Sequence, residues 1–332
     1  MWHTAGLGCP AYLPAPPPEN LTTPAIRLSG VTKTFDQHTA VRDLSLEVPR
    51  GSLCGFIGPN GSGKTTSIRM ILHIIQPDSG TVEVLGESGT RAANDRVGYL
   101  PEERGLYKKM KVHRLLQYYG SLKGMPVREA SREADAWLER LGLTEWRAAK
   151  IEALSKGMSQ KIQFISTVIS RPELIILDEP FSGLDPVNLE VLRTAILELI
   201  EGGTTVVLST HDMAVAESLC DNIVMIFKGD KVLDGTVGEI QAQYGQDTIR
   251  VRTDAGARAL EGIRGVEQVR DLGALQELRY RGDSQELLAA LTQVTHVRHF
   301  EECRPTLHDI FIRIAGPEAA IASSSSHAEV SV

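Results

Sequence analysis

A glycine-rich segment, "GPNGSGKTT", runs from Gly58 to Thr66 and fits the spacing G-x-x-x-x-G-K-[ST]. Glycines in such a loop let successive backbone N–H groups turn inward around phosphates, and a following helix adds partial positive charge at its N-terminus. Lys64 is placed to reach the β- and γ-phosphates of a nucleoside triphosphate, and Thr65 to hold Mg²⁺ through its hydroxyl. The other loop residues that we expect around the phosphates are Asn60, Gly61, Ser62, Gly63 and Thr66. The alternative is an ordinary glycine turn with a surface lysine.

Two carboxylates, Asp178 and Glu179, end the apolar run "LIILDEP". An acidic pair after a strand is commonly no more than a solvated strand end, but a phosphate loop upstream changes that interpretation. In α/β folds the carboxyl ends of the strands form the ligand-binding edge of the sheet. We therefore expect Asp178 to orient the metal ion and its waters, and Glu179 to polarise the water that attacks the γ-phosphate.

The elements that must position these groups alternate along the chain. "AIRLSGVTKTF" and "AVRDLSLEV" have the period-two pattern of antiparallel strands, and "SLCGFIG" is a buried strand that leads into the glycine loop and the helix "KTTSIRMILHII". Residues from about 107 to 167 are mainly helical, and strands and helices alternate again from "LIILDEP" onward. The pattern predicts an α/β fold of the P-loop NTPase class, with a mostly parallel sheet, an antiparallel β subdomain and a helical subdomain.

Four segments follow from changes in composition. Residues 1–24, with "PAPPPEN", predict a disordered Pro-rich tail, and residues 25–240 the nucleotide-binding domain. After about residue 241 short strands and helices predict a separate small α/β accessory domain, residues 241–315. Residues 316–332, which include "ASSSSHAEVSV", predict a flexible tail.

Composition limits the class of protein. The 332 residues are 42% hydrophobic and 23% charged, as in soluble globular proteins, and the net charge of −7 gives no expectation of a nucleic-acid partner. The four cysteines are far apart, which excludes a C-x-x-C metal site and favours a reducing cytoplasm. No apolar run approaches the roughly 20 residues that a membrane-spanning helix needs.

The set of motifs, in this order, resembles the nucleotide-binding subunit of an ABC-type ATPase over about residues 25–240. "LSKGMSQ" lies where that family has its signature sequence, commonly "LSGGQ", and "FSGLD" follows the carboxylates as the D-loop. "LSTHD" supplies the switch histidine, His211, and Phe35 matches the aromatic residue that stacks on adenine.

The resemblance implies how these residues work. Two subunits lie head to tail, and Ser155 and Gly157 of one reach the γ-phosphate of the ATP held by the other, while Asp185 communicates between the two sites. The positive end of a helix that begins near Ser159 is expected to point at the same phosphate. Without the resemblance, Ser155 is a helix cap, His211 a surface or core histidine and Phe35 a core residue.

Two departures from the family pattern stand out. Lys156 replaces a glycine of the signature and Met158 a glutamine, whereas Ser155 and Gly157, which are expected to touch phosphate, are kept. Glu102 replaces the Q-loop glutamine: it offers a carboxylate oxygen to a metal ion or water but has no NH₂ donor. "YLPEERGLY", "LSKGMSQK" and the C-terminal domain are similar to a bacterial exporter subgroup that includes sodium-efflux and drug-resistance ATPases.

The expected function is that of an energy-coupling ATPase subunit with ATP and Mg²⁺, peripheral on the cytoplasmic face of the membrane. It is expected to form a homodimer and to act with a separate membrane-spanning permease subunit, which docks beside residues 99–120. One alternative is a soluble ABC-type ATPase that acts on ribosomes or nucleic acid, and another is a small-molecule kinase. The sequence names neither the transported substrate nor the role of the C-terminal domain.

Overall fold

The computed structural model describes residues 23–88, 95–103, 105–245, 248–260 and 262–316 of the chain. The chain divides into two compact units, Met1–Asp234 and Gly235–Val332. The predicted boundary at residues 240/241 falls inside helix α7 (Val237–Gln243), which packs with α9 (Leu307–Ala315) of the second unit. The predicted tails lie outside the described residues, except for residues 23, 24 and 316.

A six-stranded sheet forms the centre of the first unit, in the order β10-β9-β3-β8-β7-β6. Four neighbouring pairs are parallel: β9 with β3, β3 with β8, β8 with β7, and β7 with β6. The strands are β3 (Leu53–Ile57), β6 (Val97–Leu100), β7 (Leu174–Asp178), β8 (Thr205–Thr210), β9 (Asn222–Phe227) and β10 (Asp230–Thr236). Every residue of β3, β7 and β8 is buried, as expected of parallel strands covered on both faces. The mostly parallel sheet is as predicted.

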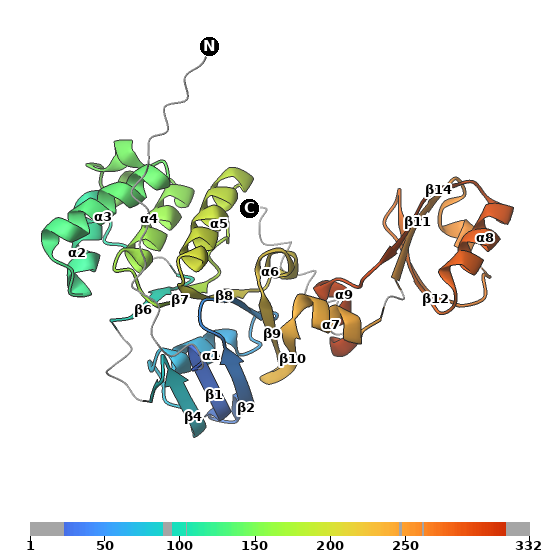
Figure 1. The fold of residues 1–332 in the computed structure, drawn as a ribbon, viewed down its shortest axis with the longest axis horizontal. Coiled ribbons are helices and arrows are strands. Elements are labelled where there is room, and N and C mark those ends of the chain that lie inside the picture. The colour runs from blue at the N-terminus through green and yellow to red at the C-terminus, as the bar shows by residue number, and fades with distance from the viewer. Residues whose placement is uncertain (1–22, 89–94, 104, 246–247, 261, 317–332) are drawn as a thin grey trace, which may run out of the picture. The chain divides into compact units, whose positions relative to one another are not determined.

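The helices α1 (Lys64–Ile71), α5 (Pro186–Glu201) and α6 (Met213–Leu219) follow β3, β7 and β8, in that order (Figure 1). Because the strands are parallel, the carboxyl ends of β3, β7 and β8 meet at one edge. That edge therefore receives the glycine loop, the Asp178–Glu179 pair and His211. Helix α1 is shorter than the sequence predicts: it ends at Ile71, and His73 adopts φ 53°.

The same unit contains an antiparallel sheet, in the order β2-β1-β4-β5. Its strands are β1 (Ile26–Phe35), β2 (His38–Val48), β4 (Ser79–Val84) and β5 (Glu87–Ser88). Its apolar face shares one core with α1 and the parallel sheet, to which Leu28, Val41, Ile68 and Phe56 contribute. The tight β1–β2 hairpin pairs Phe35 with His38.

The helical part of the first unit contains α2 (Val112–Leu122), α3 (Val127–Arg140) and α4 (Lys156–Val168), with short 3-10 turns at Thr144–Trp146 and Ile151–Ala153. The rings of Trp137 and Phe164 meet edge to face at 5.9 Å between α3 and α4. Helix α4 begins at Lys156, earlier than the predicted start near Ser159. The reason is that Ser155 is its N-cap and accepts a 3.2 Å hydrogen bond from the backbone N–H of Met158.

The second unit has the predicted small α/β architecture. Its antiparallel sheet has the order β12-β13-β11-β14, with β11 (Thr248–Thr253), β12 (Val266–Asp271), β13 (Gln276–Tyr280) and β14 (Val297–Cys303). Helix α8 (Ser284–Val294) and a 3-10 turn at Gly256–Leu260 cover one face through Ile249, Val251, Leu278 and Leu287. None of the helices in the described part of the chain is both long and apolar enough to cross a bilayer.

Candidate functional site

The glycine loop between β3 and α1 has a backbone that larger residues cannot adopt. Gly58 has φ 149° and Gly63 φ 113°. A Cβ on Gly58 would overlap the carbonyl oxygen of Ile226, and one on Gly63 would lie 2.5 Å from the carbonyl oxygen of Ala40. The loop therefore requires glycine at both positions, and it ends at the N-terminus of α1, where backbone N–H groups and the helix dipole favour an anion.

Lys64 turns back over this loop. Its Nζ donates hydrogen bonds of 2.6 Å to the Gly58 carbonyl and 3.1 Å to the Pro59 carbonyl. Burial lowers the pKa of Lys64, and the carboxylates of Glu179, Asp178 and Glu102 oppose that shift. The ammonium thus lies between the loop and the acidic edge of the sheet, as a γ-phosphate ligand must.

Ser62 provides a second sign of an anion site. Its Oγ is buried and finds no hydrogen-bond partner among the residues that the structure describes. A buried hydroxyl without a partner costs free energy on the order of 1–3 kcal/mol. A phosphate oxygen would supply the missing partner, so the residues of the loop fit a phosphate group.

The loop borders a cavity of about 400 Å³. Most of the predicted site residues line it: Phe35, Asn60, Gly61, Ser62, Gly63, Lys64, Thr65, Thr66, Glu102, Asp178 and Glu179. His38 and Ala40 of β2 also line it, although no motif marked them. The signal for His38 was the tight hairpin, which places it opposite Phe35. Gly58 lies in the loop but not on the cavity wall.

Glu179, the first residue after β7, has an unusual backbone. It adopts φ 49°, a conformation that non-glycine residues rarely take outside functional sites and turns. Its backbone N–H donates a 2.9 Å hydrogen bond to the carbonyl of Ser209 in β8, and its side chain is nearly buried. The neighbouring strand therefore fixes the direction in which this carboxylate leaves the sheet.

His211 binds that carboxylate directly. Its Nδ1 lies 2.7 Å from Oε1 of Glu179, and its backbone N–H donates to the same oxygen at 2.9 Å. The hydrogen bond to Glu179 raises the pKa of His211. Burial raises the pKa of Asp178, which ends β7 beside them. The structure thus brings together a carboxylate that can accept a proton and an imidazole that orients it.

The oxygen donors in the cavity fit a magnesium ion. Thr65, Asp178 and Glu102 all line it. Within the described ranges, no group of three or more His, Cys, Asp or Glu side chains is arranged to hold a metal ion by protein ligands alone. Mg²⁺ is commonly held by one or two carboxylates together with substrate phosphates and water. The donor set therefore suits Mg²⁺ that binds together with a nucleotide.

Five predicted residues do not line the cavity: Gly58, His211, Ser155, Gly157 and Asp185. Gly58 belongs to the loop and His211 contacts Glu179, whereas the other three have no such link to the cavity. Ser155 Oγ caps α4, as the alternative interpretation holds, and its O–H remains able to donate to another group. Asp185 caps α5 and accepts hydrogen bonds of 3.1 and 3.0 Å from the backbone N–H groups of Val187 and Asn188. The contact of these three residues with a nucleotide stays a prediction.

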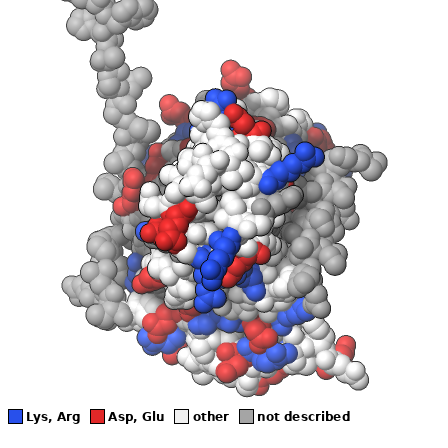
Figure 2. Space-filling model, turned by 90° about the vertical axis from the view of Figure 1, so that its right-hand side faces the viewer, with Lys and Arg blue, Asp and Glu red and all other residues white. Residues whose placement is uncertain are grey.

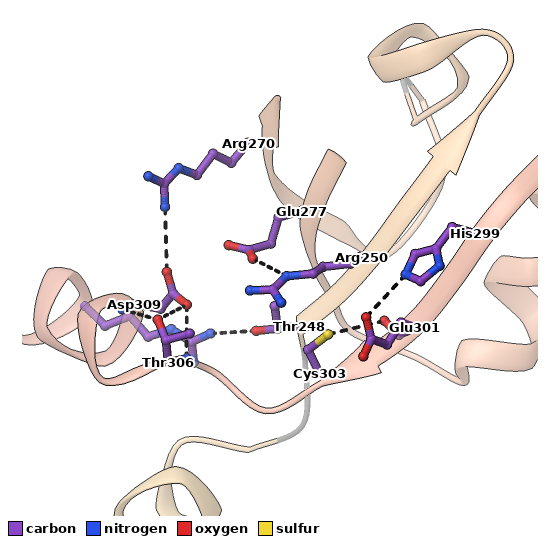
Figure 3. Close-up of polar contacts among 10 residues, drawn as sticks. Thr248, Arg250, Arg270, Glu277, His299, Glu301, Cys303, Thr306 and Asp309 are labelled. Carbon is purple, nitrogen blue, oxygen red and sulfur yellow. Dashed lines mark hydrogen bonds and ion pairs between the residues drawn. The ribbon is translucent and has the colours of Figure 1, made fainter. Parts of the chain in front are cut away.

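A second cavity, of about 350 Å³, lies in the C-terminal unit among β12, β13 and α9. Three charged groups of its wall are in ion pairs (Figure 3): Arg270 lies 3.8 Å from Asp309, and Glu277 lies 2.9 Å from Arg250, which is not on the wall. Arg313 donates to the carbonyl of Tyr244. The face of the molecule in Figure 2 likewise shows basic and acidic side chains next to one another. We therefore assign the chemistry to the first cavity.

Comparisons with known proteins agree with this geometry. Residues 41–182 match the family described as ABC transporter, and residues 235–315 match the C-terminal domain of ATP-binding proteins like DrrA1-3. The chain is 42% identical over 293 residues to YhaQ of Bacillus subtilis (strain 168), described as an uncharacterized ABC transporter ATP-binding protein; the match covers 88% of this chain and 98% of YhaQ.

A second relative is the daunorubicin resistance ATP-binding protein DrrA3 of Streptomyces coeruleorubidus, 31% identical over 310 residues, which cover 90% of this chain and 98% of DrrA3. Among solved structures, an ATP-binding subunit of an ABC transporter matches with a TM-score of 0.63 and 28% identity, over 67% of this chain and 93% of that one. Both matches agree with the family and the fold that the sequence predicted.

Proposed function

Since the chain belongs to the ATP-binding subunits of ABC transporters, which hydrolyse ATP to drive transport, we propose that two copies of it form a head-to-tail dimer that drives a separate membrane-spanning permease. The single observation that carries this proposal is the contact between Glu179 and His211 at the edge of the phosphate-loop cavity. It places a proton acceptor and its orienting group opposite Lys64.

The first step in this proposal is binding of the triphosphate. The loop N–H groups and Lys64 hold the phosphates, and Phe35, which is 46% exposed, offers its ring to the adenine. That exposure argues against the alternative in which Phe35 is a core residue. Thr65 and Asp178 hold Mg²⁺, with Glu102 near it, and the ion neutralises charge on the phosphates when it is bound.

Glu179 then acts on the attacking water. Its Oε1 accepts hydrogen bonds from His211, and its Oε2 accepts one of 3.3 Å from Thr210 Oγ1. These contacts orient the carboxylate so that it can polarise the water and receive its proton. Lys64 stabilises the charge that develops on the transferred phosphoryl group.

The second copy completes the site. Ser155 and Gly157 lie at the N-terminus of α4 and do not line the cavity of their own chain. They are therefore available to contact the γ-phosphate of the ATP that the partner binds. Asp185, in the D-loop of the same chain, communicates between the two sites. ATP thus brings the two copies together, and its hydrolysis lets them separate.

A patch formed by α2 and the segment just before it is the proposed docking surface for the permease. Tyr107, Tyr118 and Leu122 are exposed, and the first two rings meet edge to face at 6.0 Å. Exposed aromatic and aliphatic side chains next to one another mark interaction sites. Docking there places the protein on the cytoplasmic face of the membrane, and likeness to the resistance protein DrrA3 supports export as the direction. The comparisons support a transporter subunit and not the ribosomal or nucleic-acid alternative.

The test is the variant Glu179→Gln. It keeps the size of the side chain and one oxygen that can still accept from His211, but it has no negative charge and cannot take up a proton. We expect the full-length variant to bind ATP, to form a stable dimer in size-exclusion chromatography with light scattering, and to release very little phosphate. Hydrolysis at the wild-type rate would refute the role of Glu179.

A further inference from the structure

Lys156 lies in the segment "LSKGMSQ", at the position where the common family pattern "LSGGQ" has glycine, and it packs on the D-loop of its own chain. It is the first residue of α4 and is exposed. A Cβ on Gly183 would overlap the Nζ of Lys156 and lie 2.8 Å from its Cε. Gly183 has φ 68°, a conformation that favours glycine. The end of the Lys156 side chain occupies the space that a side chain at position 183 would take.

The ammonium of Lys156 is not neutralised. No hydrogen bond or ion pair joins it to any residue that the structure describes. The first turn of α4 contains no acidic residue. Asp185, two positions after Gly183, uses its carboxylate to cap α5 and accepts from Asn188 Nδ2 as well.

The positive end of α4 and this lysine therefore add their charges on one small area, between Ser155 and Gly157. An area of this kind favours a strongly charged anion over a neutral or cationic ligand. In contrast, the lysine of the phosphate loop, Lys64, is buried and donates to two carbonyls of its own chain. Lys156 is the exposed cation of the two.

We propose that Lys156 binds the terminal phosphate of the ATP held by the other copy of the chain, and so adds a charged contact to those of Ser155 and Gly157. This inference rests on the proposed head-to-tail dimer. Gly183 keeps the stem of the lysine against the D-loop, so that the ammonium stays on the face that meets the partner. An ammonium–phosphate contact is a charge-assisted hydrogen bond, which we expect to tighten ATP-driven dimerisation about tenfold or more.

The first experiment compares Lys156→Met with Lys156→Arg in full-length protein that also carries Glu179→Gln. We expect Lys156→Met to raise the ATP concentration for half-maximal dimer formation about tenfold, and Lys156→Arg to keep most of the wild-type response. Thermal unfolding without nucleotide should be unchanged in both, because the side chain is exposed. An unchanged ATP requirement in Lys156→Met would overturn the inference.

The second experiment places the substitution on a chosen side of the dimer. Both copies carry Glu179→Gln, and one of them also carries Lys64→Ala, which disables its phosphate loop. The two copies have different affinity tags, so that only mixed dimers are captured. The amount of mixed dimer captured is measured as the ATP concentration is increased. Lys156→Met on the Lys64→Ala copy faces the intact ATP site and should weaken capture. The same substitution on the other copy faces the disabled site and should have no effect. Both pairs contain the same substitutions in total.

Ser155→Ala, tested in the same two placements, separates the two proposals. If Ser155→Ala and Lys156→Met both weaken capture only from the Lys64→Ala copy, both proposals are supported. If only Ser155→Ala shows this asymmetry, the head-to-tail dimer stands and the role of Lys156 is refuted. If neither does, the head-to-tail dimer is refuted and the role of Lys156 with it.

Discussion

The side-chain amide of Gln160 donates a 2.8 Å hydrogen bond to the carbonyl of Pro180, the residue that follows Glu179. Gln163, one turn further along α4, donates to the carbonyls of Pro101 and Glu103 at 3.3 and 3.4 Å, on either side of Glu102. One face of α4 thus binds the backbone next to Glu179 and on both sides of Glu102. These hydrogen bonds link the position of α4 to the backbone on the C-terminal side of Glu179, the proposed catalytic carboxylate.

Gln160→Met should show this coupling. The substitution keeps the length of the side chain but leaves the Pro180 carbonyl without its donor. We expect a loss of about 1–2 kcal/mol in the free energy of unfolding and a fall in kcat that exceeds any change in KM for ATP. The matched control is Gln76→Met, at an exposed position of the same unit. An unchanged kcat in stable Gln160→Met would show that the hydrogen bond does not position Glu179.

The sequence alone could not show this relationship, because Gln160 and Gln163 look like the polar side of an amphipathic helix. What it could show was local or topological. The glycine loop is one continuous segment, and parallel strands bring their carboxyl ends to one edge, so the meeting of Asp178, Glu179 and the loop was predictable. The left-handed backbone of Glu179 was not, because it depends on a hydrogen bond to β8.

The contact between His211 and Glu179 predicts how stability depends on pH. The folded-state pKa of His211 is raised above its unfolded value by that hydrogen bond. The stabilisation is therefore fully present below the unfolded pKa, about 6.5, and is lost as pH rises through the folded pKa. Because the His211 side chain is 41% exposed, we expect less than about 1 kcal/mol.

Denaturant unfolding of the wild type, His211→Asn, Glu179→Gln and the double variant at pH 6 and pH 9 measures this contribution as a coupling free energy. The coupling should be larger at pH 6. A coupling free energy that is equal at the two pH values, or larger at pH 9, would contradict an ion pair between His211 and Glu179.

Two glycines of the phosphate loop offer a matched pair of substitutions. A Cβ on Gly58 would overlap a backbone carbonyl, whereas one on Gly61 would meet no atom within 4 Å and only the cost of φ 75° remains. We expect Gly61→Ala to lower stability by about 1–2 kcal/mol and Gly58→Ala by about 1–3 kcal/mol more, through overpacking. Equal unfolding midpoints and equal ATP binding in the two variants would show that the loop relaxes around the new methyl group.

Phe35→Ala tests whether this exposed ring binds adenine. Stacking of a base on an aromatic side chain contributes about 1–3 kcal/mol, so the ATP concentration for half-maximal activity should rise roughly fivefold to a hundredfold. The melting temperature should hardly change, because the ring leaves almost half of its surface exposed. Phe35→Tyr, which retains a ring, is the control. A fall in melting temperature with unchanged ATP affinity would instead indicate a packing role.

Leu122→Glu tests the docking patch on α2. Leu122 is 58% exposed and lies four residues after Tyr118, so both are on one face of the helix. A carboxylate there should abolish co-purification with the membrane-spanning partner from detergent-solubilised membranes, because burial of an unpaired charge in an apolar contact is costly. ATP hydrolysis by the isolated subunit should be unchanged, since α2 contributes no residue to the cavity. Val294→Glu, at an exposed apolar position on α8 of the other unit, is the control and should leave the complex intact. Retention of the partner by Leu122→Glu would move the docking surface away from α2.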